Sequence, residues 1–346
     1  MASLKRIAAE LGVSYTLVSK VLSGRLGTTG VSAKTREAIL KKARELEYVP
    51  NRLAVALKAG RKGAVGIFLH RIGSPGSDVS ERLLRGIAEG LEESDLRMWL
   101  RFFTTDEDFL VACDKRLKSE VDGLIVAGRA HPGLIPKFKE LEQQQVPVVS
   151  IFNDPPDNLV KILTNVAVDY ERQGYLATRH LLAQGCRSLA CFATNEKRTN
   201  GFLLAHREAG IKVNPKLLVL TDSFELEYGE RSLDQLLKRD IPFDGIVCQS
   251  DAQANGVINE FVRRGIKVPA EIKVTGVDNS AVAADCIVPI TSVTSEMRHA
   301  GLAAVKLLLK KIAGDPVESQ AIESSLFVRH SCGAGRPQMP SGDELE

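Results

Sequence analysis

The sequence lacks any long hydrophobic run. Although 44% of its 346 residues are hydrophobic, no stretch approaches the roughly 20 consecutive apolar residues that a membrane-spanning helix requires. The N-terminal residues MASLKRIAAELGVS have neither the apolar core nor the small-residue cleavage site of a secretion signal. We therefore expect a cytoplasmic protein, and the chain is long enough for two or three domains.

Clustered metal ligands and enzyme motifs are also lacking. The six cysteines form no C-x-x-C pair and no cysteine–histidine cluster, and the six histidines form no H-E-x-x-H set, which argues against disulfides and zinc. Gly128 and Gly133 have the spacing of a phosphate-binding loop, but Leu134 stands where that loop needs a lysine. Dinucleotide and hydrolase motifs are missing as well. We expect no catalytic residue, no metal ion and no cofactor, although spacing alone does not reveal a triad assembled in space.

Positive charge is unevenly distributed along the chain. The formal net charge is +3, yet residues 1–62 contain 13 Lys and Arg against 4 Asp and Glu, a net charge of +9 that leaves −6 for the rest. A basic head on a mildly acidic body is typical of a protein that binds a polyanion such as nucleic acid. The alternative is that these charges form only the solvated surface of Lys-rich helices.

The basic head has the pattern of a helix-turn-helix. In residues 3–11 apolar side chains recur at helical spacing, with Ser3 as the N-cap, and Gly12 ends the helix. Ser14 can cap a second helix whose apolar residues again form one stripe. The short turn between the two is that of a motif whose second helix enters the DNA major groove. Off the apolar stripe, where base edges would be, lie Tyr15, Thr16, Ser19 and Lys20.

A third helix and a short linker segment complete the head. Ser32 caps an amphipathic stretch that extends to Glu47, and the Gly-rich residues 23–31 precede it beside the expected phosphate backbone. Pro50 then interrupts the helical pattern, and residues 51–59 are too few to form a stable helix alone in water. Such a segment would become ordered only on DNA or against a partner.

The motifs of this head resemble the DNA-binding head of the lactose-repressor (LacI/GalR) family. Gly-Val-Ser, Val-Ser-Lys, Lys-Thr-Arg-Glu and Tyr-Val-Pro-Asn-Arg-x-Ala occur in the family's order, and the resemblance extends to about residue 332. Lys20, where an arginine is common, and a longer loop at Arg25–Gly30 depart from the pattern and concern the operator sequence rather than the binding mode. The DNA contacts that the resemblance implies are Ser3, Leu4, Lys5, Ser14, Tyr15, Thr16, Ser19, Lys20, Ser32, Asn51, Arg52 and Leu57.

The resemblance also divides the chain and gives the linker a role. In chain order we expect a helix-turn-helix head, a hinge helix with its linker, a two-lobe body for effector binding and dimerisation, and a disordered tail: 1–49, 50–62, 63–332 and 333–346. Leu57 would be inserted into the minor groove at the operator centre, which unstacks a base step and bends the duplex. The alternative is that Leu53 and Leu57 pack two hinge helices together, and both roles can coexist.

From Ala64 onward short β-rich runs alternate with helical stretches. This alternation predicts an α/β body of two doubly wound parallel-sheet lobes, which the resemblance likens to a periplasmic binding protein. Ligands of such folds bind beyond the carboxyl ends of the strands, here between the lobes. The expected strands are 64–70, 98–103, 123–127, 146–152, 188–193, 245–249 and 272–277. The expected helices are 81–94, 136–144, 171–183, 201–209, 229–238, 252–264 and 296–313.

Candidate effector contacts follow from the resemblance at the ends of several strands: His70, Arg198, Phe224, Ser250 and Asp278. The guanidinium fork of Arg198 could hold hydroxyls or a phosphate, although it could instead pair with an acidic neighbour. Asp278 could accept hydrogen bonds from hydroxyls, or cap a helix, as could Asp251. Where the family commonly has Asp-Arg, this chain has Phe152 and Asn153, which argues against assigning the ligand by analogy with any one member.

These features favour a sequence-specific transcription regulator, in the first instance a repressor, whose DNA affinity is modulated by a small effector such as a sugar or sugar derivative. The expected partners are an inverted-repeat operator in double-stranded DNA and a second copy of the chain, without a membrane partner. Residues 333–346 contain no heptad repeat, so we expect a homodimer, assembled near residues 81–94 and 113–118, rather than a coiled-coil tetramer. The alternatives are a solute-binding protein, which would lack the basic head, and a sugar-metabolising enzyme, which would need a motif absent here.

Overall fold

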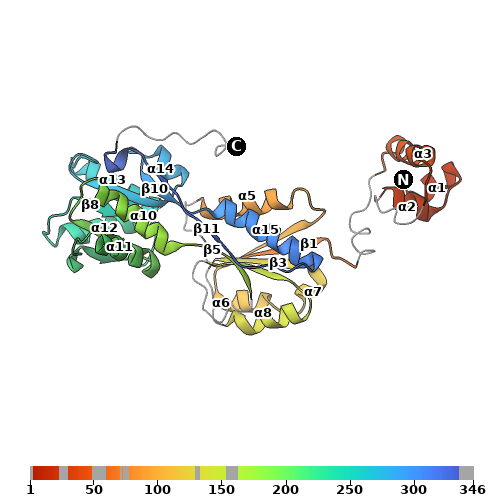
Figure 1. Ribbon diagram of the computed structural model, residues 1–346, viewed down its shortest axis with the longest axis horizontal. Coiled ribbons are helices and arrows are strands. Elements are labelled where there is room, and N and C mark those ends of the chain that lie inside the picture. The colour runs from red at the N-terminus through yellow and green to blue at the C-terminus, as the bar shows by residue number, and fades with distance from the viewer. Residues whose placement is uncertain are drawn as a thin grey trace.

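The protein consists of a small helical head and a two-lobed α/β body, as predicted, and the head stands apart from the body (Figure 1). The computed structural model describes residues 3–22, 30–48, 60–70, 72, 78–128, 133–152 and 163–334. Each helix in these ranges is too short or too polar to traverse a lipid bilayer. Three predicted DNA contacts (Asn51, Arg52 and Leu57) and the tail after Ala334 lie outside the described residues.

The head is a bundle of three helices, α1 (Leu4–Leu11), α2 (Tyr15–Leu22) and α3 (Ala33–Glu45). The hydroxyl of Ser3 accepts a backbone N–H at 3.2 Å and closes the first turn of α1, and Gly12, at φ 64°, ends it in the left-handed region. Ile7, Val18 and Ile39, one from each helix, are fully buried and form the centre of the head core. The sequence pattern predicted both the caps and the buried stripes of this head.

Each lobe of the body is built on a six-stranded sheet. The strands are β1 (Ala64–His70), β2 (Arg97–Phe103), β3 (Gly123–Gly128), β4 (Val148–Ile151), β5 (Thr164–Val168), β6 (Leu189–Ala193), β7 (Leu218–Leu220), β8 (Gly245–Val247), β9 (Lys273–Asp278), β10 (Thr291–Thr294), β11 (Gln320–Ile322) and β12 (Leu326–Phe327). The sheet of lobe 1 has the order β11-β5-β4-β3-β1-β2, and its neighbours are all parallel. The sheet of lobe 2 has the order β12-β10-β9-β8-β6-β7, in which only the β10–β12 pair is antiparallel. Both are therefore doubly wound sheets, whose strand order reverses beside β1 and beside β6.

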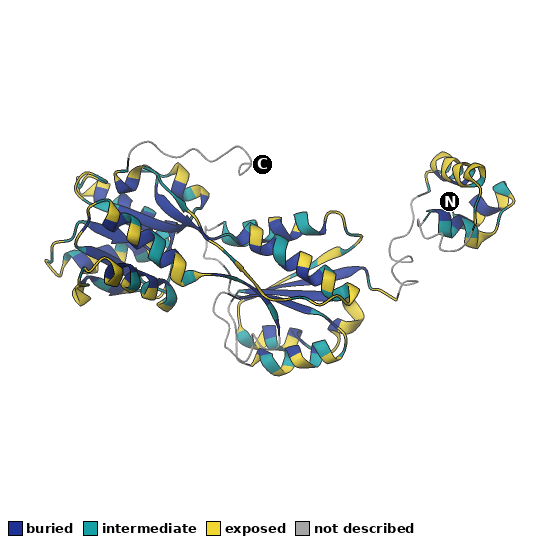
Figure 2. Cartoon of the chain, viewed as in Figure 1, coloured by how far each residue is buried: buried dark blue, intermediate teal, exposed yellow. Residues whose placement is uncertain are grey.

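Helices cover both faces of each sheet. They are α5 (Val79–Leu91), α6 (Asp106–Ala112), α7 (Leu117–Glu120), α8 (Leu134–Gln143), α10 (Tyr170–Ala183), α11 (Glu196–Glu208), α12 (Leu226–Leu237), α13 (Asp251–Arg263), α14 (Ala281–Asp285) and α15 (Met297–Ala313). In lobe 1, α5 and α15 pack on one face and α6 and α8 on the other. In lobe 2, α10 and α11 pack on one face and α12 and α13 on the other. The strands between these layers are the most deeply buried part of the body (Figure 2).

The chain passes between the lobes three times within the described residues. It leaves lobe 1 after β5 to begin α10, returns after β10 to form α15, and leaves again between β11 and β12 (Figure 1). Strand β5 pairs with β11, although about 150 residues separate them in sequence. Each lobe is therefore assembled from two separate stretches of the chain.

Helices α10 and α11 approach each other backbone to backbone. A Cβ on Gly174 would lie 1.9 Å from the carbonyl oxygen of Arg198, and a Cβ on Gly201 would lie 2.0 Å from that of Glu171. Neither position can accept a side chain without separating the two helices. The contact brings Gln173 of α10 beside the first turn of α11, where Arg198 lies.

Strand β10 was not predicted, because its sequence Thr-Ser-Val-Thr is mostly hydroxylic. Thr291 and Ser292 are nevertheless fully buried, and their hydroxyls donate to a backbone carbonyl at 3.1 Å and to the carboxylate of Asp251 at 2.5 Å. Burial of these polar groups depends on partners that are distant in sequence. Other elements absent from the sequence prediction are short or lie at sheet edges: α6, α7, α14, β5, β7, β11 and β12.

Helix α11 begins five residues earlier than predicted, at Glu196 instead of residue 201. The side chain of Asn195 accepts the backbone N–H of Arg198 at 3.1 Å and caps the helix. The sequence interpretation placed Arg198 in a loop between strand and helix. The structure corrects this: Arg198 lies in the first turn of α11, where the helix fixes its direction.

Candidate functional site

Helix α2 presents polar side chains on the surface of the head. Its two buried valines point into the core, whereas Tyr15 is 42% exposed and Thr16 is exposed. Ser19 and Lys20 are half-buried. The arrangement leaves the face that the sequence assigned to base recognition on the outside of the head.

Three of the predicted DNA contacts are helix caps. The hydroxyls of Ser3, Ser14 and Ser32 accept backbone N–H groups at the starts of α1, α2 and α3, at 3.2, 3.1 and 3.1 Å. Leu4, in the first turn of α1, is half-buried. Because the N-terminal end of a helix attracts anions, all three starts favour contacts with phosphates.

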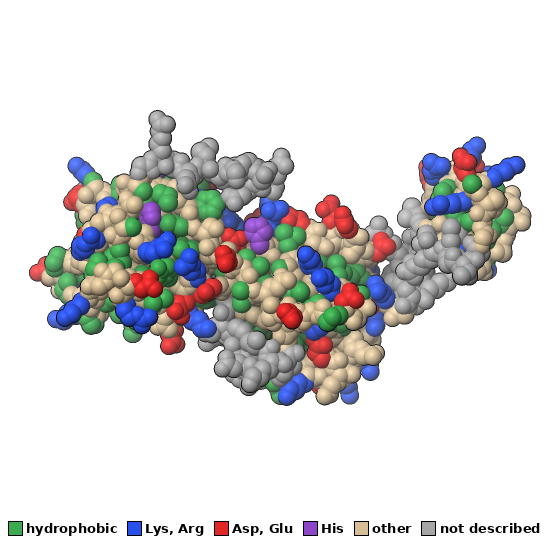
Figure 3. Space-filling model, in the orientation of Figure 1, with side chains coloured by type: hydrophobic (Ala, Val, Ile, Leu, Met, Phe, Trp, Pro, Cys, Tyr) green, Lys and Arg blue, Asp and Glu red, His purple; other side chains and the backbone are tan. Residues whose placement is uncertain are grey.

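Basic side chains are plentiful on the head (Figure 3). Lys5, Arg6 and Lys34 are exposed, and Arg6 also forms an ion pair with Glu10 at 2.8 Å. Lys42 lies 3.4 Å from Glu10 and links α3 to α1. Part of the positive charge of the head therefore stabilises the bundle, and Lys5 and Lys34 lie on its surface.

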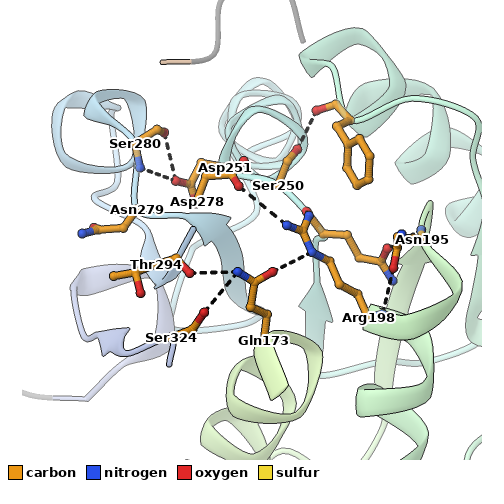
Figure 4. A network of polar contacts seen from close by, with 12 residues as sticks. Gln173, Asn195, Arg198, Ser250, Asp251, Asp278, Asn279, Ser280, Thr294 and Ser324 are labelled. Carbon is orange, nitrogen blue, oxygen red and sulfur yellow. Dashed lines mark hydrogen bonds and ion pairs between the residues drawn. The ribbon is translucent and has the colours of Figure 1, made fainter. Parts of the chain in front are cut away.

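In lobe 2 the candidate effector residues gather where the strand order reverses. Arg198 follows β6, Ser250 follows β8, and Asp278 is the last residue of β9. The carboxyl ends of parallel strands meet at one edge of a sheet, which is where ligands of doubly wound folds bind. Figure 4 shows Arg198 and Asp278 facing each other across this edge, with Ser250 nearby.

Arg198 is the centre of this group and is 5% exposed. Its Nε donates to Oε1 of Gln173 at 2.9 Å and its Nη1 to the backbone carbonyl of Gln249 at 2.5 Å. Its Nη2 lies 3.8 Å from Oδ1 of Asp278. The guanidinium also lies 4.4 Å from the ring centre of Tyr170 and 5.4 Å from that of Phe224. The position and direction of the fork are thus fixed by the protein itself.

Asp278 combines backbone strain with a perturbed carboxyl group. Its φ of 114° is unusual for a residue with a side chain. Burial raises the pKa of the Asp278 carboxyl from 3.8 to about 7, against the opposing effect of Arg198, and the nearby Asp251 and Asp78 raise it further. The Asp278 carboxyl group can therefore hold a proton near neutral pH. Its 3.8 Å distance from Nη2 of Arg198 shows that the pairing of Arg198 with an acidic neighbour, which the sequence left open, is present.

Asp251 organises the adjacent turn. Its Oδ2 accepts from the backbone N–H and the hydroxyl of Ser280 at 2.7 and 2.9 Å, and its Oδ1 accepts from the hydroxyl of Ser292. Burial raises its pKa to about 6, although these hydrogen bonds act in the opposite direction. Ser250, not Asp251, caps α13, by accepting the N–H of Gln253 at 3.1 Å. Asp251 therefore holds the turn that follows β9 in place.

Lobe 1 reaches this site through the start of α5. Oδ2 of Asp78 accepts the backbone N–H of Ala281 in lobe 2 at 3.3 Å and the Nε of Arg82 at 2.9 Å. The other carboxylate oxygen of Asp78 is buried without a hydrogen-bond partner among the described residues. Three buried hydroxyls in the described part of lobe 2 also lack a partner, those of Thr221 after β7, Thr275 in β9 and Ser295 after β10.

The other predicted effector contacts occupy different surroundings. His70 is fully buried in lobe 1, stacked on Phe109 with 4.7 Å between ring centres and paired with Asp106 at 2.8 Å. Ser250 is 2% exposed, and its hydroxyl donates to the backbone carbonyl of Phe224. The ring of Phe224 is half-buried beside Arg198. Arg198, Phe224, Ser250 and Asp278 thus lie together in lobe 2, and His70 lies apart from them.

Sequence reasoning missed several residues of the site. Tyr170 and Gln173 come from α10. Gln249, two residues after the end of β8, accepts the backbone N–H groups of residues 194 and 195 through its side chain at 3.1 and 2.6 Å. Only Gln249 had a signal in the sequence, since it is the last residue of a predicted strand, whereas the others depend on tertiary contacts. In the described part of the chain, no three histidine, cysteine or acidic side chains are grouped to hold a metal ion.

Comparisons with known families agree with this organisation. Residues 3–51 match the family "Bacterial regulatory proteins, lacI family", and residues 178–332 match a "Periplasmic binding protein-like domain". The chain is 31% identical over 341 residues to the HTH-type transcriptional regulator DegA of Bacillus subtilis, a match that covers 94% of this chain and 96% of DegA. It is 28% identical to the HTH-type transcriptional repressor PurR of Pasteurella multocida, over 96% and 98% of the two chains.

Solved structures show the same fold over 96% of the chain. A transcriptional regulator CelR in complex with cellobiose is 26% identical, with a TM-score of 0.69 and coverage of 96% of this chain and 100% of that one. A lac repressor dimer bound to operator and an anti-inducer is 23% identical, with a TM-score of 0.78 and coverage of 96% and 99%. The head, the body and their order along the chain are therefore common to all three proteins.

Proposed function

Because this chain belongs to the lacI family of bacterial regulatory proteins, and is a DNA-binding transcription regulator and not an enzyme, we propose that a small carbohydrate bound in its body controls its affinity for an operator. The observation that supports DNA recognition most directly is the exposed polar face of α2 on a basic three-helix head. We keep the division into a head at 1–49, a hinge and linker at 50–62, a body at 63–332 and a tail at 333–346 as part of this proposal.

The charges around Arg198 favour a neutral effector. Acidic and basic side chains are equal in number around the site: Asp78 with Arg82, Asp278 with Arg198, and Asp251 with Arg329. Their charges therefore balance above about pH 7, where the Asp278 carboxyl is ionised. An anionic effector would have to compete with Asp278 for the guanidinium. The buried oxygens without partners at Asp78, Thr221 and Ser295 suit the hydroxyls of a sugar. We assign direct contacts to Arg198, Phe224, Ser250 and Asp278. For His70, which is fully buried, we propose only an indirect role, through its pairing with Asp106.

The operator proposal predicts that a homodimer of about 75 kDa, twice 37.7 kDa, selects an inverted repeat from random DNA. Lys20→Ala should weaken binding to that DNA by about 30-fold or more, because the dimer loses one base contact in each half-site and each contributes about 1–3 kcal/mol. Fluorescence anisotropy measures the affinity and light scattering the mass. Lys212→Ala, at an exposed lysine of lobe 2, is the control and should bind as the wild type does. Selection of asymmetric DNA, or a tetramer that survives removal of residues 333–346, would contradict the proposal.

The effector proposal predicts that Arg198→Lys abolishes the response to sugar but leaves DNA binding intact. Lysine keeps the positive charge but cannot reproduce the three directed contacts of the guanidinium. Cellobiose and ribose, which are bound to two structural relatives, are the first probes, together with a panel of monosaccharides and disaccharides. Their binding is measured as a shift in melting temperature and as a change in operator affinity.

The wild type should respond to at least one sugar, and Arg198→Lys should respond at least ten-fold more weakly, with operator affinity unchanged in the absence of sugar. Arg187→Lys, in the same lobe but before β6, is the matched control and should respond as the wild type does. A wild type that ignores every neutral sugar but responds to an anion would overturn the carbohydrate assignment.

A further inference from the structure

The linker from the head enters the body through a bidentate contact with one buried carboxylate. The backbone N–H groups of Lys62 and Gly63 donate to Oδ1 and Oδ2 of Asp122 at 2.9 and 2.7 Å. Asp122 is 9% exposed and stands directly before β3. Lys62 and Gly63 are the last residues before β1 begins at Ala64. The Asp122 carboxylate therefore binds the backbone at the point where the linker ends.

Further hydrogen bonds tie the same point to both neighbours of β1. The carbonyl of Gly63 accepts the N–H of Arg97 at the start of β2 at 3.0 Å. The N–H of Asp122 donates to the carbonyl of Ala64 at 2.7 Å. The end of the linker is therefore fixed to three strands of lobe 1, and its direction follows the position of that sheet. Hydrogen bonds to a charged acceptor are stronger than neutral ones, so this junction resists bending.

Lobe 2 contains the same pair of hydrogen bonds, from two consecutive backbone N–H groups to one aspartate, before its strand β6. Oδ2 and Oδ1 of Asp244 accept the N–H groups of Arg187 and Ser188 at 2.6 and 3.0 Å, just before β6. Asp244 precedes β8 as Asp122 precedes β3, and each is followed by a glycine. In lobe 2, however, the residues that Asp244 binds belong to the connection between α10 and β6, which lies within the lobe. The two aspartates thus perform the same local task, but only one of them holds the connection to DNA.

We propose that Asp122 is a positioning residue for DNA binding, because its hydrogen bonds to the backbone of Lys62 and Gly63 transmit the arrangement of lobe 1 to the linker and head. The inference rests on the proposed operator binding and adds the point at which the body controls it. The competing explanation is that Asp122 only stabilises the start of β1, as Asp244 stabilises the start of β6. The duplication supplies the control that separates these two explanations.

The test compares Asp122→Asn with Asp244→Asn in the full-length protein. An amide offers one acceptor oxygen instead of two, and its NH₂ faces a backbone donor, so each variant loses one of the two hydrogen bonds. The probe is the DNA that the wild type selects from a random pool. Operator affinity is measured by anisotropy, melting temperature by calorimetry, and amide hydrogen exchange over residues 60–64 by mass spectrometry.

We expect the two variants to lose similar melting temperature, whereas only Asp122→Asn loses at least ten-fold in operator affinity and in protection of residues 60–64. Equal losses of affinity, or an unchanged affinity of Asp122→Asn, would overturn the inference and leave operator binding standing. A wild type that selects no DNA would overturn the proposed function and this inference with it. If Asp122→Asn does not fold, the pair Asp122→Glu and Asp244→Glu, which keeps the charge but shifts it by one methylene, replaces it with the same expected outcomes.

Discussion

Replacement of Ile39 by alanine should abolish operator binding without affecting the body. Ile39 is fully buried at the centre of the head core, which contains only six buried apolar residues among those described. Truncation of a large aliphatic side chain to alanine in a core costs about 2–5 kcal/mol. A module of this size has little stability in reserve because it buries a small fraction of its surface. The head should therefore unfold.

The measurement combines operator affinity with calorimetry of the full-length protein. The transition of the body should stay at the wild-type temperature while DNA binding falls by at least 100-fold. Leu40→Ala is the matched control, because Leu40 is the next residue of α3 and is 37% exposed. A variant at Ile39 that still binds operator at wild-type strength would show that the head is more stable than its core indicates.

Asp278→Asn should remove most of the pH dependence of stability of lobe 2. Because the folded-state pKa of Asp278 is raised from 3.8 to about 7, the folded protein holds this proton more tightly than the unfolded chain. The resulting stabilisation is complete below pH 4 and is lost as the pH rises to 7. Each pKa unit corresponds to about 1.4 kcal/mol, so the free energy of unfolding should fall by roughly 2–3 kcal/mol between pH 5 and 7 from this group alone.

Asparagine resembles the protonated aspartic acid at every pH, so the variant should show a flatter profile. Urea unfolding of the wild type and the variant at pH 5, 6, 7 and 8 gives the two curves. Asp251, whose pKa is raised to about 6, contributes in the same direction up to pH 6 and remains in both proteins. Asp222→Asn, at an exposed position of the same lobe, is the control and should follow the wild type. Parallel curves for Asp278→Asn and the wild type would contradict the assigned burial of this carboxyl.

The head and the apolar strands could be predicted from sequence because their signals are local. The stripe and caps of α1, with Ser3 and Gly12 at its ends, lie within ten residues. Strand β1 was predicted with its observed bounds because its sequence is mostly apolar, and in the structure all seven of its residues are buried. Strand β10 could not be found in this way, since Thr291 and Ser292 are buried only because residues 251 and 329 accept their hydrogen bonds.

The candidate site was predictable only in part, for the same reason. Arg198 and Asp278 follow strands and could be selected, but the partners that orient Arg198 come from elsewhere in the chain. Gln173 contacts Arg198 because glycines allow α10 to lie directly against α11. The spacing of apolar residues in the sequence does not predict that contact. The sequence also contains a repeated motif that was not used in the prediction. Asp-Gly followed by aliphatic residues occurs at residues 122–126 and again at residues 244–247, and its aspartates are the two that hold the starts of β1 and β6.

The three passages of the chain between the lobes determine how the protein can be divided. Lobe 1 needs residues up to Val168 together with α15 and β11, and lobe 2 needs the stretch between them together with β12. A single cut in the gene therefore cannot release either lobe whole. A fragment that starts at α10 would carry α15 and β11 with most of their contacts missing, including the pairing of β11 with β5. Deletion series and domain fusions should keep residues 60–334 together, and ribosomal synthesis must reach β11 before lobe 1 can complete its sheet.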